Sequence, residues 1–138
     1  MDTGKLSLKA ASAIMQYVPV GPLVAGSELD ETVIRAGSYN VLPLGMTIAT
    51  VPTYGQPVAV EACRGRRAKA IAAASLGALV PVAVGSTNGH LIPLMPSGLT
   101  AHIASGGDVA MRYAVGFALK SAADGDVFDI IVDPHAVL

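Results

Sequence analysis

Six prolines lie in or beside the apolar stretches of this 138-residue chain, and they restrict the sheets that it can form. Proline has no backbone N–H to donate to a strand ladder, so within sheets it occupies edge strands, the starts of strands or bulges. The six are Pro43, Pro52, Pro57, Pro81, Pro93 and Pro96. So many interruptions predict short, bent and twisted strands. We therefore expect a mainly β fold, a small single-domain barrel or sandwich of short antiparallel strands.

Turn-forming dipeptides mark where these strands reverse. Asn88-Gly89 lies between two apolar stretches, and both residues tolerate the positive φ angles of a type I′ hairpin turn. Asp124-Gly125 has similar turn chemistry and also separates two apolar stretches. The sequence therefore predicts two hairpins in its second half.

Alternating apolar residues predict two strands with one buried face each. Val58 and Val60 share one face of the segment 57–62. Near the C-terminus, one face holds the apolar residues Phe128, Ile130 and Val132. The opposite face of that segment holds Val127, Asp129, Ile131 and Asp133. This period of two is what a half-buried strand requires.

The segment 66–77 fits two kinds of secondary structure. Its alanine-rich composition and the glycine at its end, Gly77, are typical of a helix. An alternation that places Arg67, Lys69 and Ile71 on one face fits a strand equally. From propensity alone helix is favoured, and both alternatives stay open at this point.

The first 20 residues have the composition of an extended arm. They begin small and polar, and become apolar at Ile14, Met15, Tyr17 and Val18 just before Pro19. We therefore expect an N-terminal arm over residues 1–20, followed by one β-rich domain over residues 21–138. The four apolar residues are our candidates for anchoring the arm on a partner.

The composition predicts a subunit of a larger assembly. Charged residues make up 14% of the chain and hydrophobic residues 52%, with a mean hydropathy of +0.56. An average soluble domain has roughly 25% charged residues, so much of this surface must be apolar. Large apolar patches on soluble proteins usually mark contact surfaces.

Several other classes of protein fit poorly. A net charge of −1 gives no general field for attracting nucleic acid or an anionic membrane. The longest apolar run, residues 78–84, is interrupted by Pro81 and is far shorter than the ~20 residues of a membrane helix. No secretory signal is apparent, and the single cysteine, Cys63, cannot form an internal disulfide. We expect synthesis in a reducing cytoplasm.

No motif for catalysis, a cofactor or a metal stands out. Phosphate-binding loops, dinucleotide-binding fingerprints, zinc-protease motifs and nucleophile elbows are missing from the sequence. The histidines His90, His102 and His135 are scattered, and a zinc site would need them to converge with a carboxylate such as Asp108 or Asp133. Cys63 next to a histidine base would be a nucleophile, but at the end of an apolar strand it is more typical of a small core residue. We expect no enzyme activity and no cofactor.

A short basic run is the strongest charge feature. Arg64, Arg66, Arg67 and Lys69 account for four of the nine basic residues within six positions. A nucleic-acid site would use them for phosphate contacts, yet the run contains no aromatic residue on which bases stack. A salt-bridging contact with an acidic partner fits better. The aspartates near the C-terminus lack the spacing of an EF-hand, and we expect them on a solvent-facing strand.

The last third of the sequence has a distinctive pattern of small and apolar residues. It consists of an apolar strand with Val-Gly-x-Ala-Leu, a turn of small residues ending in Ala-x-Gly-Asp, and a final β-branched strand. The pattern is carried by Val115, Gly116, Ala118, Leu119, Ala122, Ala123, Gly125, Asp126, Ile130, Ile131 and Val132. These positions are not a catalytic fingerprint. With them, the sequence from Gly55 to Pro134 resembles the capsid decoration (cement) proteins of tailed bacteriophages.

The resemblance implies a barrel-like or tulip-like β fold and a strand, rather than a helix, over residues 66–74. It also implies a protein that binds the major capsid protein on the outer surface of the mature head and stabilises it against internal DNA pressure. Members commonly form trimers at three-fold or quasi-three-fold positions of the capsid, so we expect this protein to self-associate. We also expect it to be part of a virion that is made in a bacterial host. Another virion component built on the same small β domain, from the head or the tail, is the alternative.

Overall fold

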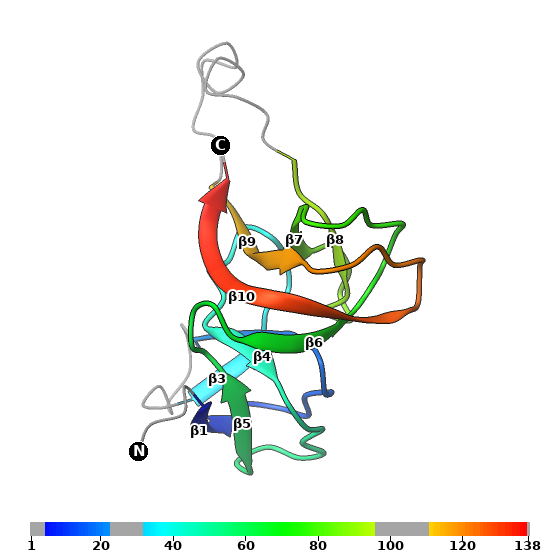
Figure 1. The fold of residues 1–138 in the computed structure, drawn as a ribbon. Coiled ribbons are helices and arrows are strands. Elements are labelled where there is room, and N and C mark those ends of the chain that lie inside the picture. Colours follow the sequence, from blue (N-terminus) through cyan, green and yellow to red (C-terminus); the bar gives the residue numbers. More distant parts are fainter. Residues whose placement is uncertain (1–4, 23–31, 96–110, 138) are drawn as a thin grey trace.

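The computed structural model describes residues 5–22, 32–95 and 111–137, and it confirms a small all-β domain (Figure 1). The strands are β1 (Lys5–Ala10), β2 (Pro19–Pro22), β3 (Thr32–Arg35), β4 (Gly45–Thr47), β5 (Pro57–Glu61), β6 (Arg67–Ile71), β7 (Pro81–Val84), β8 (Leu91–Pro93), β9 (Arg112–Ala118) and β10 (Val127–Val137). The described part of the chain contains no helix, and hence none that could span a membrane.

The strands form two sheets. The first is a closed barrel in the order β1-β3-β2-β4-β5, in which β1 and β3 are parallel and the other neighbours antiparallel. The second runs β6-β10-β9-β7-β8. The edge strands of this second sheet, β6 and β8, are linked by a single parallel bridge between Ala72 and Leu91. The sheet therefore curls toward a barrel that is barely closed between β6 and β8. In Figure 1 the first sheet lies below the second.

The two sheets are copies of one five-stranded unit. We call residues 5–61 the first unit and residues 67–137 the second. Strands β1 to β5 correspond in chain order to β6 to β10, and each pairing in the first unit recurs in the second. The register is also the same. On β4, Met46 pairs with Pro19 on one side and Glu61 on the other, as Phe117 on β9 pairs with Pro81 and Ile131.

Irregular backbone features recur as well. An isolated antiparallel bridge joins Ile14 to Val51, and its counterpart joins Leu76 to Ala122. Three residues after each bridge comes a non-glycine residue with positive φ, Tyr17 at 64° and Leu79 at 62°. Their backbone N–H groups donate to corresponding carbonyls, those of Thr47 and Ala118. The sequence analysis did not predict this repeat.

Each unit has its own core, and the cores correspond. In the first unit the buried residues are Ala10, Ile14, Val18, Val20, Val33, Val51, Val58 and Val60. Their counterparts, in the same order, are Ala72, Leu76, Val80, Val82, Leu91, Ala122, Phe128 and Ile130. Leu91 and Phe128, which are larger than their valine counterparts, help to fill the second core. Phe128, Ile130 and Val132 all belong to it, which supports their predicted inward face.

The first unit completes the core of the second, which makes the chain one domain. Ala36 and Met46 belong to the first unit by sequence but pack within the second core, and Met46 has no exposed surface. Two hydrogen bonds hold the same joint: the backbone N–H of Tyr113 donates to the carbonyl of Tyr39 (2.7 Å), and Asn40 Nδ2 donates to the carbonyl of Met111 (3.0 Å).

Most local predictions hold. The segment 66–74 contains a strand, β6, rather than a helix, as the resemblance implied. β7 and β8 form the predicted hairpin, but its turn is not type I′. Only Gly89 has a positive φ there, because the backbone first makes a turn in which the N–H of Gly89 donates to the carbonyl of Ser86.

The expected N-terminal arm is wrong for its described part. Residues 5–10 form β1, which pairs along its length with β5 and at its end with β3. Ile14 and Val18 are then drawn into the first core. The chain is extended only in part between β1 and β2, so these residues do not show the pattern of a strand, and the core segment was hidden in the sequence.

Candidate interaction surfaces

The basic run and the aspartates of the last strand form one charged ladder. β6 pairs with β10 so that Lys69 lies opposite Asp129. Lys69 Nζ is 3.2 Å from Asp129 Oδ1, and Arg67 Nη1 is 4.0 Å from Asp129 Oδ2. The Arg67 and Lys69 side chains are 73% and 54% exposed and Asp129 is 30% exposed, so each pair stabilises the fold by about 1 kcal/mol at most.

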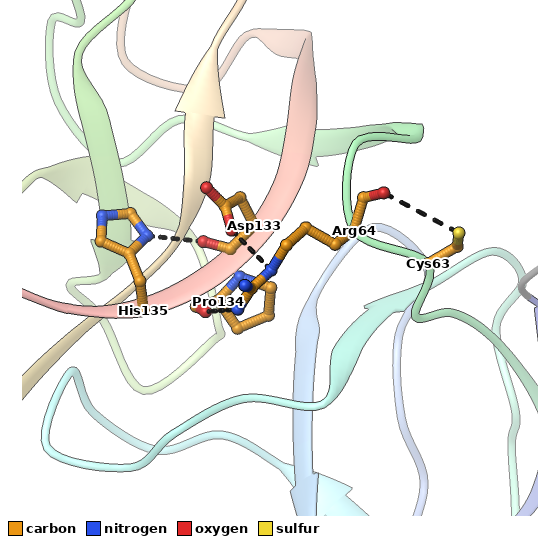
Figure 2. Close-up of polar contacts among 5 residues, drawn as sticks. All are labelled: Cys63, Arg64, Asp133, Pro134 and His135. Carbon is orange, nitrogen blue, oxygen red and sulfur yellow. Dashed lines mark hydrogen bonds and ion pairs between the residues drawn. The ribbon is translucent and has the colours of Figure 1, made fainter.

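Arg64 lies at the end of this ladder, on the β5–β6 connection. Its Nε is 2.8 Å from Asp133 Oδ1, and its Nη2 donates to the carbonyl of Pro134 (2.8 Å) (Figure 2). Of the predicted polar interface, Arg64, Arg67 and Lys69 are therefore paired with acidic residues of their own chain. Arg66 is exposed and has no side-chain partner among the described residues. It remains the residue of the run that is free for an acidic partner.

The predicted arm anchors separate into two kinds. Ile14 and Val18 are buried in the first core and are not available to a partner. Met15 is 59% exposed, and Tyr17 lines a groove between the two units.

That groove has a volume of about 330 Å³ and encloses a buried acid. It is lined by Tyr17, Thr47, Ile48, Glu61, Arg67, Ala68 and Lys69. Glu61 is only 5% exposed, and its Oε2 has no hydrogen-bond partner among the described residues. Lys5 lies opposite Glu61 in the register of β1 and β5. Thr47 is already engaged, since its hydroxyl donates to the carbonyl of Met15 (2.7 Å).

No catalytic arrangement forms around the lone thiol in the described part of the chain. Cys63 is half-buried, and its Sγ lies 3.8 Å from the carbonyl oxygen of Arg64. Figure 2 shows Cys63 and His135 on opposite sides of Arg64. The His135 ring instead stacks on Phe117, with 5.1 Å between ring centroids, and its Nδ1 lies 2.6 Å from the carbonyl oxygen of Asp133.

Metal-binding residues do not gather in the described ranges either. No group of three or more histidine, cysteine or acidic side chains comes together there. His102 and Asp108, which a zinc site would have needed, lie outside the described residues.

The surface is rich in large apolar side chains, as the composition predicted. Those exposed among the described residues are Met15, Ile34, Tyr39, Val41, Leu42, Leu44, Ile48, Tyr54, Leu79, Met95, Met111 and Val127. Four of them fall within residues 39–44, on the connection between β3 and β4. We call this segment the apolar loop. This segment was not singled out from the sequence, although Leu42 and Leu44 flank Pro43.

Comparison with known proteins identifies the fold. No family model matches the sequence, and no curated protein matches it. Among solved structures, the N base of the head fiber gp8.5 of bacteriophage phi29 matches with a TM-score of 0.64. The chain has the fold of a phage head-fiber base. The likeness covers 97% of this chain and 96% of the head-fiber base, so it includes both units, and 16% of the residues are identical.

Proposed function

We propose that this protein is a structural component of a phage virion, bound to the outer surface of the head through the major capsid protein. One observation carries the proposal: the chain shares its fold over nearly its whole length with the base of a phage head fiber. The exposed apolar side chains support it, because a subunit of an assembly keeps such residues for its partners. The role is structural rather than catalytic.

In its finer form the proposal is a decoration, or cement, function. A protein that binds the mature shell more tightly than the immature one stabilises the mature state by that difference in affinity. Binding across neighbouring capsid subunits would resist the pressure of packaged DNA. Self-association, with a trimer at three-fold or quasi-three-fold positions, is part of this proposal.

The apolar loop is the first candidate for the shell contact. Leu42 is half-exposed within a run of apolar residues, whereas Val127 is similarly exposed on β10 but has charged neighbours. The second candidate is Arg66, which is exposed and free to meet an acidic surface.

Co-sedimentation with expanded and unexpanded heads of the parent phage tests the function. We expect saturable binding to expanded heads, weakened at least tenfold by Leu42→Glu and unchanged by the matched control Val127→Glu. Arg66→Glu should weaken binding, and Lys120→Glu, the same charge change at another exposed site, should not. Absence of binding to both forms of the head would reject the proposal.

A second candidate function is anchoring, favoured by the identity of the matching structure as a fiber base. An anchor binds the head without necessarily strengthening it. Heating heads with and without bound protein separates the two roles. A higher temperature of DNA release supports cement, and an unchanged temperature despite full occupancy supports an anchor.

A further inference from the structure

The two units meet head to tail. The main strand contacts between them join β4 of the first unit to β6 and β10 of the second. On the other side of the joint, residues 37–40 line a hollow together with residues 84–87. If a two-fold axis related the two units, the counterparts of these contacts, β9 with β1 and β9 with β5, would be equally extensive. They are not among the main contacts between the units. One unit therefore presents β4, and the other presents β6 and β10.

The presenting surface is a row of outward-facing side chains, which we call the outer row. In the first unit it is Pro19, Met46 and Glu61, adjacent to one another across β2, β4 and β5. Met46 and Glu61 are buried by the second unit. They face outward from their own barrel because their neighbours in the chain, Val60 among them, fill its core.

The same row exists in the second unit without a third unit to cover it. Its members are Pro81, Phe117 and Ile131, in the same register across β7, β9 and β10. All three are half-exposed and apolar. His135 covers one face of the Phe117 ring, yet the ring remains accessible. The second row is thus more apolar than the first, since Ile131 stands where the first has Glu61.

We propose that the outer row of the second unit docks on the first unit of a second copy of this chain, at the surface formed by β1 and β5, and so repeats the joint within the chain. The partner follows from the repeat, because β1 and β5 are the counterparts of β6 and β10, the strands that contact β4 within the chain. Such a head-to-tail contact closes into a ring when its rotation allows. The proposal does not depend on binding to a phage head, so the two can fail separately.

Sedimentation equilibrium of the full chain tests this contact. We expect a concentration-dependent oligomer, and at least a hundredfold weaker association for Phe117→Glu and for Ile131→Lys. Val127→Glu, on the same strand β10, is the control and should associate like the wild type. Circular dichroism shows whether each variant is folded. A wild-type chain that stays monomeric at 100 µM, or folded outer-row variants that associate normally, would overturn the proposal.

Hydrogen exchange on the wild-type chain tests which surfaces meet, and it needs no variant. Raising the protein concentration should protect amides of β9 and, to the same degree, amides of β1 and β5. Protection at β9 without protection at β1 and β5 would mean that two outer rows face each other across a two-fold axis, and would overturn the head-to-tail contact.

Discussion

Gly45 on β4 and Gly116 on β9 occupy the same position in the two units, and each lies against the backbone of the next strand. A Cβ atom on Gly45 would overlap the carbonyl oxygen of Glu61, and one on Gly116 would overlap that of Ile131. Both glycines are required by close approach of two strands. The repeat has thus preserved a backbone contact at a point where the side chains on either side differ.

This contact predicts that Gly45→Ala and Gly116→Ala each lower the free energy of unfolding by roughly 1–3 kcal/mol, because strands must move apart to admit a methyl group. Urea denaturation measures the loss. Gly37→Ala is the control, since nothing lies within 4 Å of its Cβ position, and it should be neutral or slightly stabilising. A neutral result at both strand positions would show that the sheets adjust freely.

Because Met46 of the first unit packs in the core of the second, we expect the two units to unfold together. Met46→Ala should cost roughly 2–5 kcal/mol, the range for truncating a buried methionine, although the residue belongs to the first unit. Because it fills the second core, amides of both units should exchange faster. If hydrogen exchange accelerates only in residues 5–61, the units are independent and the shared core is not a coupling element.

We expect replacement of Leu79 by asparagine to stabilise the protein. Its φ of 62° is costly for a leucine, and its side chain is 69% exposed, so little packing is lost on replacement. Asparagine tolerates this conformation, and Leu79→Asn should raise stability by a few tenths to about 1 kcal/mol. Thermal unfolding compares it with Ala78→Asn, a neighbour with ordinary φ, which should not gain. If Leu79→Asn lowers the stability as much as Ala78→Asn does, the backbone conformation of Leu79 is not strained.

The ion pair between Arg64 and Asp133 predicts a small coupling energy. A double-mutant cycle with Arg64→Gln and Asp133→Asn should give about 1 kcal/mol or less, because the Arg64 side chain is 70% exposed. The coupling should fall further in 1 M salt. A value several times larger would mean that the ladder organises the fold and not only its surface charge.

Strands with a clean alternation could be predicted from the sequence, and the arrangement of the strands could not. Val58 and Val60 on β5 show the period of two, and both are buried as expected. The Lys69–Asp129 pair was out of reach, because its residues are 60 positions apart and meet only through the order of strands in the second sheet. The basic run was therefore interpreted as an interface before its own aspartates were known to face it.

The repeat left few traces in the sequence. The two units share Val-Pro-Val at residues 18–20 and 80–82, preceded in both by a stretch of small residues, and little else. What recurs is the register and the hydrogen-bonded backbone, which many apolar side chains satisfy. Buried positions exchange valine for leucine, isoleucine or phenylalanine, so residue identity is a poor guide to this duplication.

The joint between the units gives the molecule a direction. One end carries an uncovered outer row, and the other carries the β1–β5 surface, so no rotation of the chain exchanges its ends. In a coat built from such subunits, the outer-row end of each copy would face the opposite end of the next copy. All copies around a symmetry axis would therefore be oriented in the same sense. On a closed shell this would set a fixed sense of circulation about each symmetry axis where the protein gathers.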